Sequence, residues 1–226
     1  MAVLLFSLLS SSAIEFDCDF NFVYKWDLLG QVYHCGVEAA RNVEVTQLTA
    51  VNGKHLIGKG NDDVLMLYVW NTTVLSKIPS GIGQKFPYLK GLDWKQVGLK
   101  SISKQSLEQF PRLEYLSLSE NQLVALDGDL FVNNPQLKNL NFSKNAIRSI
   151  DDDLLDELKG IQIADFSENE CVNFIAAWDS SKFDELKKHF ASNCSVELDD
   201  DDDSGTSNAL ITFWVILVAM ITVYQL

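Results

Sequence analysis

The sequence predicts an α/β solenoid, with short parallel strands on a curved concave face and loops with short helical turns on the convex face. Two observations predict it. A 24-residue motif recurs along the middle of the chain, and four cysteines flank the repeated region in two pairs. An internal period of this length indicates stacked structural units that share one core.

The motif appears in five segments that align without a gap and share the pattern LxxLxLxxNxLxxI. The repeats cover residues 65–176, as 65–88, 89–112, 113–136, 137–160 and a partial unit at 161–176. The LxL part alternates with the period of a strand. We therefore expect positions 1, 4, 6, 11 and 14 of each repeat to face the core. Position 6 would form a mostly aromatic column of Trp70, Trp94, Leu118, Phe142 and Phe166.

This pattern is the leucine-rich-repeat signature. With its paired cysteines, the chain resembles small extracellular leucine-rich-repeat proteins with disulfide caps, of the kind found on invertebrate cell surfaces, over roughly residues 16–196. It departs from the best-known flanking modules, since each cap has two cysteines instead of four. The resemblance implies a solenoid that binds protein or glycan ligands, usually on its concave face, and that carries out no catalysis.

Position 9 holds Asn121, Asn145 and Asn169 in the last three repeats. In this fold a buried Asn there bonds the backbone of neighbouring turns, which would otherwise leave polar groups unpaired. Thr73 and Val97 replace it in the first two repeats. Val97 cannot make these bonds, so an irregular or wetter turn is expected there.

Caps are expected at both ends of the repeats. Residues 14–64 would form an N-terminal β cap, because Phe20–Tyr24 and Val43–Val51 alternate like strands. Residues 177–196 would form a C-terminal cap. Its helix is predicted to begin at Ser181, with Asp184 three residues on as in a capping box. The apolar side chains Phe183, Leu186 and Phe190 would lie on one face of that helix.

The four cysteines predict disulfides in a secreted chain. Sequence order favours pairing Cys18 with Cys35 and Cys171 with Cys194. Each bond would close a short loop and contribute roughly 3 kcal/mol in the chain-entropy model. A zinc site is the alternative, but the spacing is not CxxC.

The two ends of the chain predict the cellular location of the protein. Residues 1–13 resemble a cleaved signal peptide, with a buried N-terminal helix as the alternative. Residues 197–208 would form an acidic stalk, and the apolar residues 209–226 follow it. The pattern predicts a glycosylphosphatidylinositol anchor attached near Asp203 and Ser204, although the polar spacer is short. A single-pass transmembrane helix is the alternative. Either would hold the protein on the extracellular face of the plasma membrane.

Three N-glycosylation sequons begin at Asn71, Asn141 and Asn193. The first two fall on predicted outward strand positions, so their glycans would cover both ends of the concave face. A protein partner would then contact the middle of that face. The residues predicted to bind are Lys90, Asp93, Lys95, Tyr115 and Ser117.

Met66, Leu67 and Val69 also fall on predicted outward positions. They would form an exposed apolar binding patch, or else the N-terminal cap would fold over them.

The net charge and the absence of catalytic motifs argue against several classes of function. The formal net charge of −13 argues against nucleic acid and anionic lipid as partners. The sequence has no nucleophile elbow, Gly-rich phosphate loop or HExxH motif, so we predict no enzyme, no cofactor and no metal. Two classes remain: a cell-surface recognition or adhesion protein, and a structural, matrix or ligand-sequestering protein without a signalling role.

Overall fold

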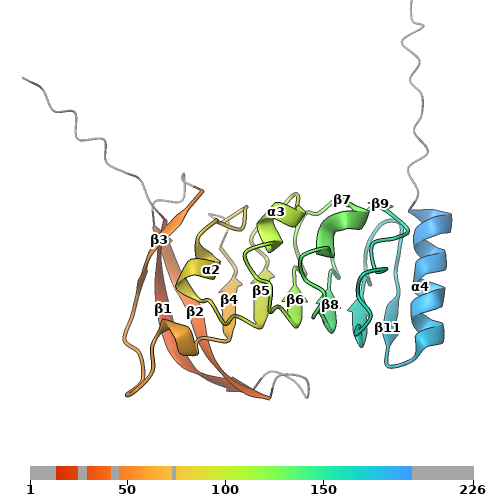
Figure 1. Ribbon diagram of the computed structural model, residues 1–226. Helices are drawn as coiled ribbons and strands as arrows, with labels where there is room; N and C mark the ends of the chain where they lie inside the picture. Colours follow the sequence, from red (N-terminus) through yellow and green to blue (C-terminus); the bar gives the residue numbers. More distant parts are fainter. Residues whose placement is uncertain (1–13, 25–29, 42–45, 73–74, 195–226) are drawn as a thin grey trace, which may run out of the picture. The chain divides into compact units, whose positions relative to one another are not determined.

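A computed structural model describes residues 14–24, 30–41, 46–72 and 75–194 (Figure 1). The predicted signal peptide, the acidic stalk with Asp203 and Ser204, and the apolar tail lie outside the described residues. Within residues 14–194, nine strands form one sheet in the order β11-β10-β8-β6-β5-β4-β2-β1-β3, and two more form a separate pair.

Each repeat contributes one strand to the large sheet. These are β4 (Met66–Trp70), β5 (Gly91–Lys95), β6 (Tyr115–Ser117), β8 (Asn139–Asn141) and β10 (Ile163–Asp165). All five pair in parallel. The leucines Leu92, Leu116 and Leu140 stand opposite one another across three neighbouring strands. The predicted solenoid with parallel strands is confirmed.

Short elements occupy the other side of the stack (Figure 1). They are α2 (Ile82–Lys85), α3 (Lys104–Leu107), η2 (Gly128–Phe131) and the parallel pair β7 (Ala125–Leu126) and β9 (Ser149–Ile150). The main core fills the space between these elements and the sheet. Trp94, Leu118, Phe142 and Phe166 are each 0% exposed in it, as the position-6 column predicts.

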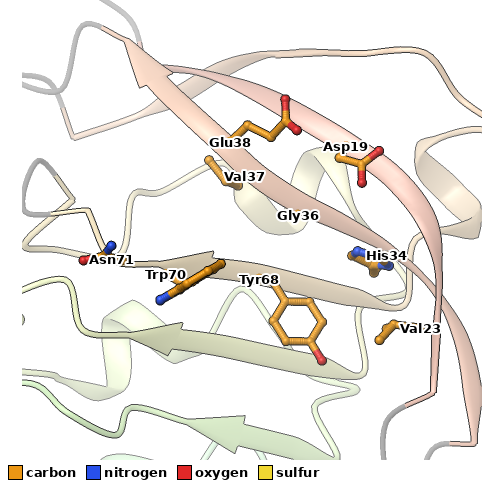
Figure 2. Close-up of a pocket in the computed structure, with 9 residues that line it drawn as sticks. All are labelled: Asp19, Val23, His34, Gly36, Val37, Glu38, Tyr68, Trp70 and Asn71. Atoms are coloured by element: carbon orange, nitrogen blue, oxygen red, sulfur yellow. The ribbon is translucent and has the colours of Figure 1, made fainter.

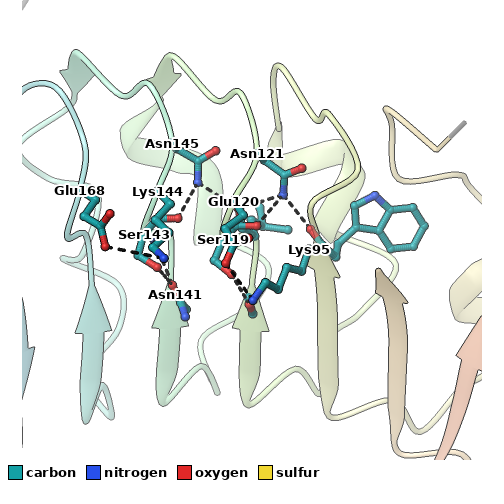
Figure 3. Close-up of polar contacts among 12 residues, drawn as sticks. Lys95, Ser119, Glu120, Asn121, Asn141, Ser143, Lys144, Asn145 and Glu168 are labelled. Carbon is teal, nitrogen blue, oxygen red and sulfur yellow. Dashed lines mark hydrogen bonds and ion pairs between the residues drawn. The ribbon is translucent and has the colours of Figure 1, made fainter. Parts of the chain in front are cut away.

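The position-9 asparagines bond the backbone as expected (Figure 3). Asn121 donates its amide to Trp94 O at 2.7 Å and to Leu118 O at 2.9 Å, and its Oδ1 accepts from Val97 N and Leu99 N. Asn145 and Asn169 repeat the arrangement. Val97 is 0% exposed, and its backbone amide donates to Asn121 Oδ1 of the next repeat.

The N-terminal cap continues the sheet. Strand β1 (Ile14–Tyr24) pairs antiparallel with β2 (Gln31–Arg41) and parallel with β3 (Leu48–Asn52), and β2 pairs in parallel with β4. A short turn, η1 (Asn61–Asp63), leads into the repeats. Cys18 and Cys35 are disulfide-bonded. The predicted β cap is therefore present, with β2 as a strand that the sequence pattern does not indicate.

The C-terminal cap consists of β11 (Ile175–Ala177), antiparallel to β10, and α4 (Ser180–Asn193). The predicted capping residue is wrong, because Asp179 is the N-cap and its Oδ1 accepts from Ser181 N at 2.9 Å. Leu186 and Phe190 are buried as expected, and Phe190 meets Phe166 edge-on with ring centroids 5.1 Å apart. The Cys171–Cys194 disulfide ties the end of α4 to the last repeat.

The register of the first repeat differs from the prediction by one position. Leu67 stands opposite Leu92, and Val69 stands opposite Trp94. The residues of each pair are 25 positions apart in the sequence, one more than the 24-residue period of the repeats. Leu67 and Val69 therefore lie in the core at 0% exposure, whereas Trp70 is 67% exposed. The predictions that placed Trp70 in the core, and Leu67 and Val69 on the outside, are wrong.

The backbone shows where the extra residue lies. One left-handed residue follows the strand in every repeat: Asn71, Gln96, Glu120, Lys144 and Glu168, with φ between 54° and 56°. The last four recur at the regular period, but Asn71 precedes Gln96 by one position more than that period. Leu75 and Leu99 return to the regular spacing and are both buried. The insertion therefore falls between Asn71 and Leu75, and a slip of one position exchanges the faces of a whole strand.

Candidate ligand-binding surface

One face of the nine-stranded sheet is directed away from the main core, and we call it the outer sheet face. Strand pairing aligns its side chains in rows. The central row runs from the cap to the last repeat through Asp19, Gly36, Tyr68, Asp93, Ser117, Asn141 and Asp165. Residues of one row point to the same side of a sheet. The row therefore crosses β1, β2 and every repeat strand as one surface.

The five residues predicted to bind a partner lie on or beside this face, but three of them are enclosed. Tyr115 and Ser117 are each 2% exposed, and Asp93 is 7% exposed. Burial, and next the charge of Asp93, raise the pKa of the Tyr115 phenol, so the ring is neutral. Lys90 and Lys95 are more accessible, and each forms an ion pair. Lys90 Nζ lies 2.7 Å from the carboxylate of Glu114, and Lys95 Nζ lies 2.9 Å from the carboxylate of Glu120. Their role in ligand binding stays a prediction.

Tyr115 belongs to a second, smaller apolar cluster on this face. Val32 of β2, Met66 and Tyr115 are buried together, and Tyr68 packs against them. Met66 is thus enclosed by residues that include the N-terminal cap, which was the alternative to an exposed patch.

Polar side chains in the last three repeats form hydrogen bonds with one another (Figure 3). Asn141 Oδ1 accepts from the hydroxyl of Ser143 at 2.7 Å, and Asp165 Oδ1 accepts from the hydroxyl of Ser167 at 2.6 Å. Ser117 and Ser119 lie with their hydroxyl oxygens 3.4 Å apart. This part of the face is internally hydrogen-bonded.

An open pocket of about 560 Å³ lies at the N-terminal end of the outer sheet face (Figure 2). We call it the cap pocket. Its walls come from β1, β2 and β4, and its lining residues are Asp19, Val23, His34, Gly36, Val37, Glu38, Tyr68, Trp70 and Asn71. The sequence pattern does not indicate this pocket, because the β2–β4 pairing is not a repeat contact and the gapless alignment gives the wrong register for β4.

The rings of the cap pocket come from two strands. Tyr68 and Trp70 project from β4, and the ring of His34 on β2 meets Tyr68 edge-on at 5.5 Å between centroids (Figure 2). Burial lowers the pKa of His34, against weaker opposing effects of the Asn21 backbone and Asp19, so this imidazole is neutral at pH 7. The pocket therefore has aromatic walls and no positive charge from this histidine.

Comparison with known proteins identifies the repeats. The family model for the leucine rich repeat matches residues 111–170. The chain carries a leucine-rich-repeat domain. No curated protein matches the sequence.

Two solved structures are similar to parts of this leucine-rich-repeat domain. One is the Toll–Spatzle complex, a molecular hub in Drosophila development and innate immunity, with 21% identity over 59% of this chain and a TM-score of 0.45. The other is the APL1 leucine-rich repeat domain, with 18% identity over 69% of this chain and a TM-score of 0.42. The matches cover 18% and 43% of those two chains, so this chain spans less than half of either.

The sequons of the leucine-rich-repeat domain differ in exposure. Asn71 is exposed at the rim of the cap pocket, Asn193 is exposed at the end of α4, and Asn141 is only partly exposed between neighbouring strands. Thr73 and Ser195, which complete two of the sequons, lie outside the described residues. Glycan occupancy at all three sites stays a prediction.

A second pocket of about 390 Å³ lies between the last repeat and α4. Its lining mixes both charges, and Lys187 pairs with Asp156 across it. Among the described residues, no group of three or more His, Cys, Asp or Glu is arranged to hold a metal ion. None of the helices within the described ranges is long and apolar enough to cross a membrane.

Proposed function

We propose that this leucine-rich-repeat domain is a non-enzymatic recognition module that binds a protein ligand through its outer sheet face, with the cap pocket as the main contact. One observation carries the proposal: an open pocket of about 560 Å³ borders Trp70, a large aromatic side chain that is 67% exposed. Exposed aromatic residues beside a concave site are typical binding determinants.

The two disulfides support an extracellular location, since such bonds persist in oxidising compartments. We further propose that the signal peptide is removed and that the protein is held at the cell surface by a lipid anchor at Asp203 or Ser204. A phospholipase that cleaves glycosylphosphatidylinositol anchors should then release the domain from intact cells. Resistance to the enzyme, with residues 209–226 still present in the mature protein, would favour a single-pass helix instead.

The binding proposal is tested with a matched pair of tryptophans. Trp70 and Trp178 are 67% and 65% exposed, but Trp178 lies beyond β11 at the other end of the sheet, where it lines the second, smaller pocket. The pair therefore also distinguishes the cap pocket from the second pocket. Full-length protein on cells is used to capture extracellular proteins, and captured partners are measured against Trp70→Ala and Trp178→Ala. Trp70→Ala should weaken binding by about tenfold or more, as expected for an aromatic hot spot, and Trp178→Ala should have little effect.

Capture that is unaffected by Trp70→Ala and by every other substitution in the cap pocket would exclude the cap pocket as the main contact. Uniform deposition in the matrix with no specific partner would favour the structural alternative.

A further inference from the structure

We propose that the cap pocket receives a basic side chain, arginine or lysine, from the protein partner. This inference rests on the proposed function and names the chemistry that the pocket recognises. Aromatic walls, two carboxylates and a glycine floor give the pocket this preference.

The aromatic walls suit a cation. Tyr68 and Trp70 are two positions apart on β4, so both rings stand on the outer sheet face, and both line the pocket with His34 (Figure 2). The faces of Trp and Tyr rings attract ammonium and guanidinium groups within about 6 Å. Trp70 is open to an incoming group, because most of its surface remains exposed.

The charge of the pocket is negative. Asp19 on β1 and Glu38 on β2 both line it and are both exposed, and none of the described residues that line it is Lys or Arg. Among the described residues, neither carboxylate takes part in a salt bridge. Lys95 stands beside Trp70 in the sheet, but its ammonium group is held by Glu120 at 2.9 Å. A ligand cation would therefore find two carboxylates that no described cation neutralises.

Gly36 leaves space between these groups. In the sheet, Gly36 pairs with Asp19 on one side and with Tyr68 on the other. The backbones of Asp19 and Tyr68 are therefore two strand spacings apart, or roughly 10 Å. Packing does not require a glycine here. A Cβ at this position would meet His34 at 3.5 Å and the backbone of Asp19 at 3.8 Å, which are ordinary contacts. A glycine inside a strand often marks the close approach of a ligand.

A sugar is the other ligand that aromatic rings and carboxylates can bind. The pocket favours a cation, because its lining carries two carboxylates as well as the rings, and none of the described residues that line it is Lys or Arg. A neutral sugar would leave the two negative charges uncompensated.

The test uses a matched pair of probes, the peptide acetyl-Gly-Arg-Gly-amide and its citrulline analogue, which has nearly the same shape but no charge. Full-length protein in mild detergent is titrated with each peptide, and the indole N–H resonance of Trp70 is followed by NMR after assignment with Trp70→Phe. The arginine peptide should shift this resonance with an affinity at least about tenfold above that of citrulline. The affinity should also fall with added salt.

Substitutions of residues that line the cap pocket test whether the arginine peptide binds there. Asp19→Asn with Glu38→Gln should reduce the affinity for the arginine peptide about tenfold or more, and Gly36→Val should abolish binding by filling the floor. Valine is a good strand former, so this change should not unfold β2. Glu168→Gln is the control, because Glu168 is an exposed acid at the other end of the repeats. Urea unfolding of each variant verifies that the fold is retained.

Equal binding of the two peptides would overturn the inference, and so would binding of a chitin or mannose oligosaccharide that survives Asp19→Asn with Glu38→Gln. If partner capture depends on Trp70 but not on Asp19 and Glu38, the basic side chain is wrong and the proposed function stands. If capture depends on none of them, the proposed function itself fails.

Discussion

Lys90 of the second repeat and Glu114 of the third form an ion pair, with Lys90 Nζ 2.7 Å from Glu114 Oε1. The other carboxylate oxygen, Oε2, lies 2.6 Å from Lys138 Nζ in the fourth repeat. The three residues occupy the same position in consecutive repeats. Burial opposes ionisation of Glu114, but the two lysines outweigh it and hold its pKa below the usual value. One carboxylate thus joins three repeats.

Replacing Glu114 by Gln should destabilise the domain by roughly 1–2 kcal/mol at pH 7, as for a charged hydrogen bond that is largely shielded from water. The folded pKa lies below the ordinary 4.5, so the stabilisation is present above that pH and is lost as the pH falls through the lowered pKa. Urea unfolding of wild type and Glu114→Gln between pH 7 and pH 3 measures this. A difference that stayed constant over this range would show that the charge is irrelevant.

The asparagines should differ in importance. Asn121 accepts from two backbone amides of the preceding repeat, whereas among the described residues Asn145 accepts from one. Asn121→Ala would leave more buried backbone groups unpaired, each costing about 1–3 kcal/mol. We expect a larger loss of unfolding free energy for Asn121→Ala than for Asn145→Ala, measured by denaturant titration. The exposed Asn133→Ala, in the third repeat, controls for loss of an amide side chain.

The register of the first repeat is tested by two neighbouring residues. Val69→Asp would place a carboxylate in the main core and should cost about 4 kcal/mol or prevent folding. Trp70→Ser should change stability by no more than about 0.5–1 kcal/mol, because this side chain is mainly exposed. Thermal unfolding distinguishes the two. The reverse order of stabilities would support the gapless alignment of the five repeats.

Each disulfide should stabilise its cap. Replacing Cys171 and Cys194 by Ser should cost about 3 kcal/mol, since the bond joins cysteines with a sequence separation of 23. Hydrogen exchange should then increase first in α4, where Leu186 and Phe190 cover the core. The pair Cys18→Ser and Cys35→Ser should instead expose β1 and β2. Equal exchange throughout the domain in both variants would mean that the caps do not unfold separately.

The sequence predicts the repeats well, because the repeat period directly determines which strands pair. Leu92, Leu116 and Leu140 stand opposite one another in the sheet as that period requires. It also predicts the asparagine bonds and both disulfides, which depend on residue type and chain order.

The first repeat strand cannot be placed from its own sequence, because LMLYVW is apolar at both alternations. Leu67 and Val69 are as suitable for a core as Tyr68 and Trp70, and only pairing with β5 decides between the two sets. The cap pocket could not be predicted for a related reason. Its walls combine β1, β2 and β4, and no periodic signal connects the cap strands to the first repeat. The enclosure of Tyr115 likewise depends on Val32, which comes from the distant N-terminal cap.

Strand β1 runs antiparallel to β2, and β11 runs antiparallel to β10, so the parallel series is closed on both sides. A further parallel repeat strand cannot continue this series at either end of the described sheet without replacing a cap. The domain can therefore be lengthened only from within, by duplicating an internal block such as residues 113–136, whose Asn121 already forms hydrogen bonds with the backbone of the unit before it. Insertions of whole repeats should be tolerated as added modules, whereas shorter ones would change the spacing between neighbouring repeats, as the longer spacing from Asn71 to Gln96 does.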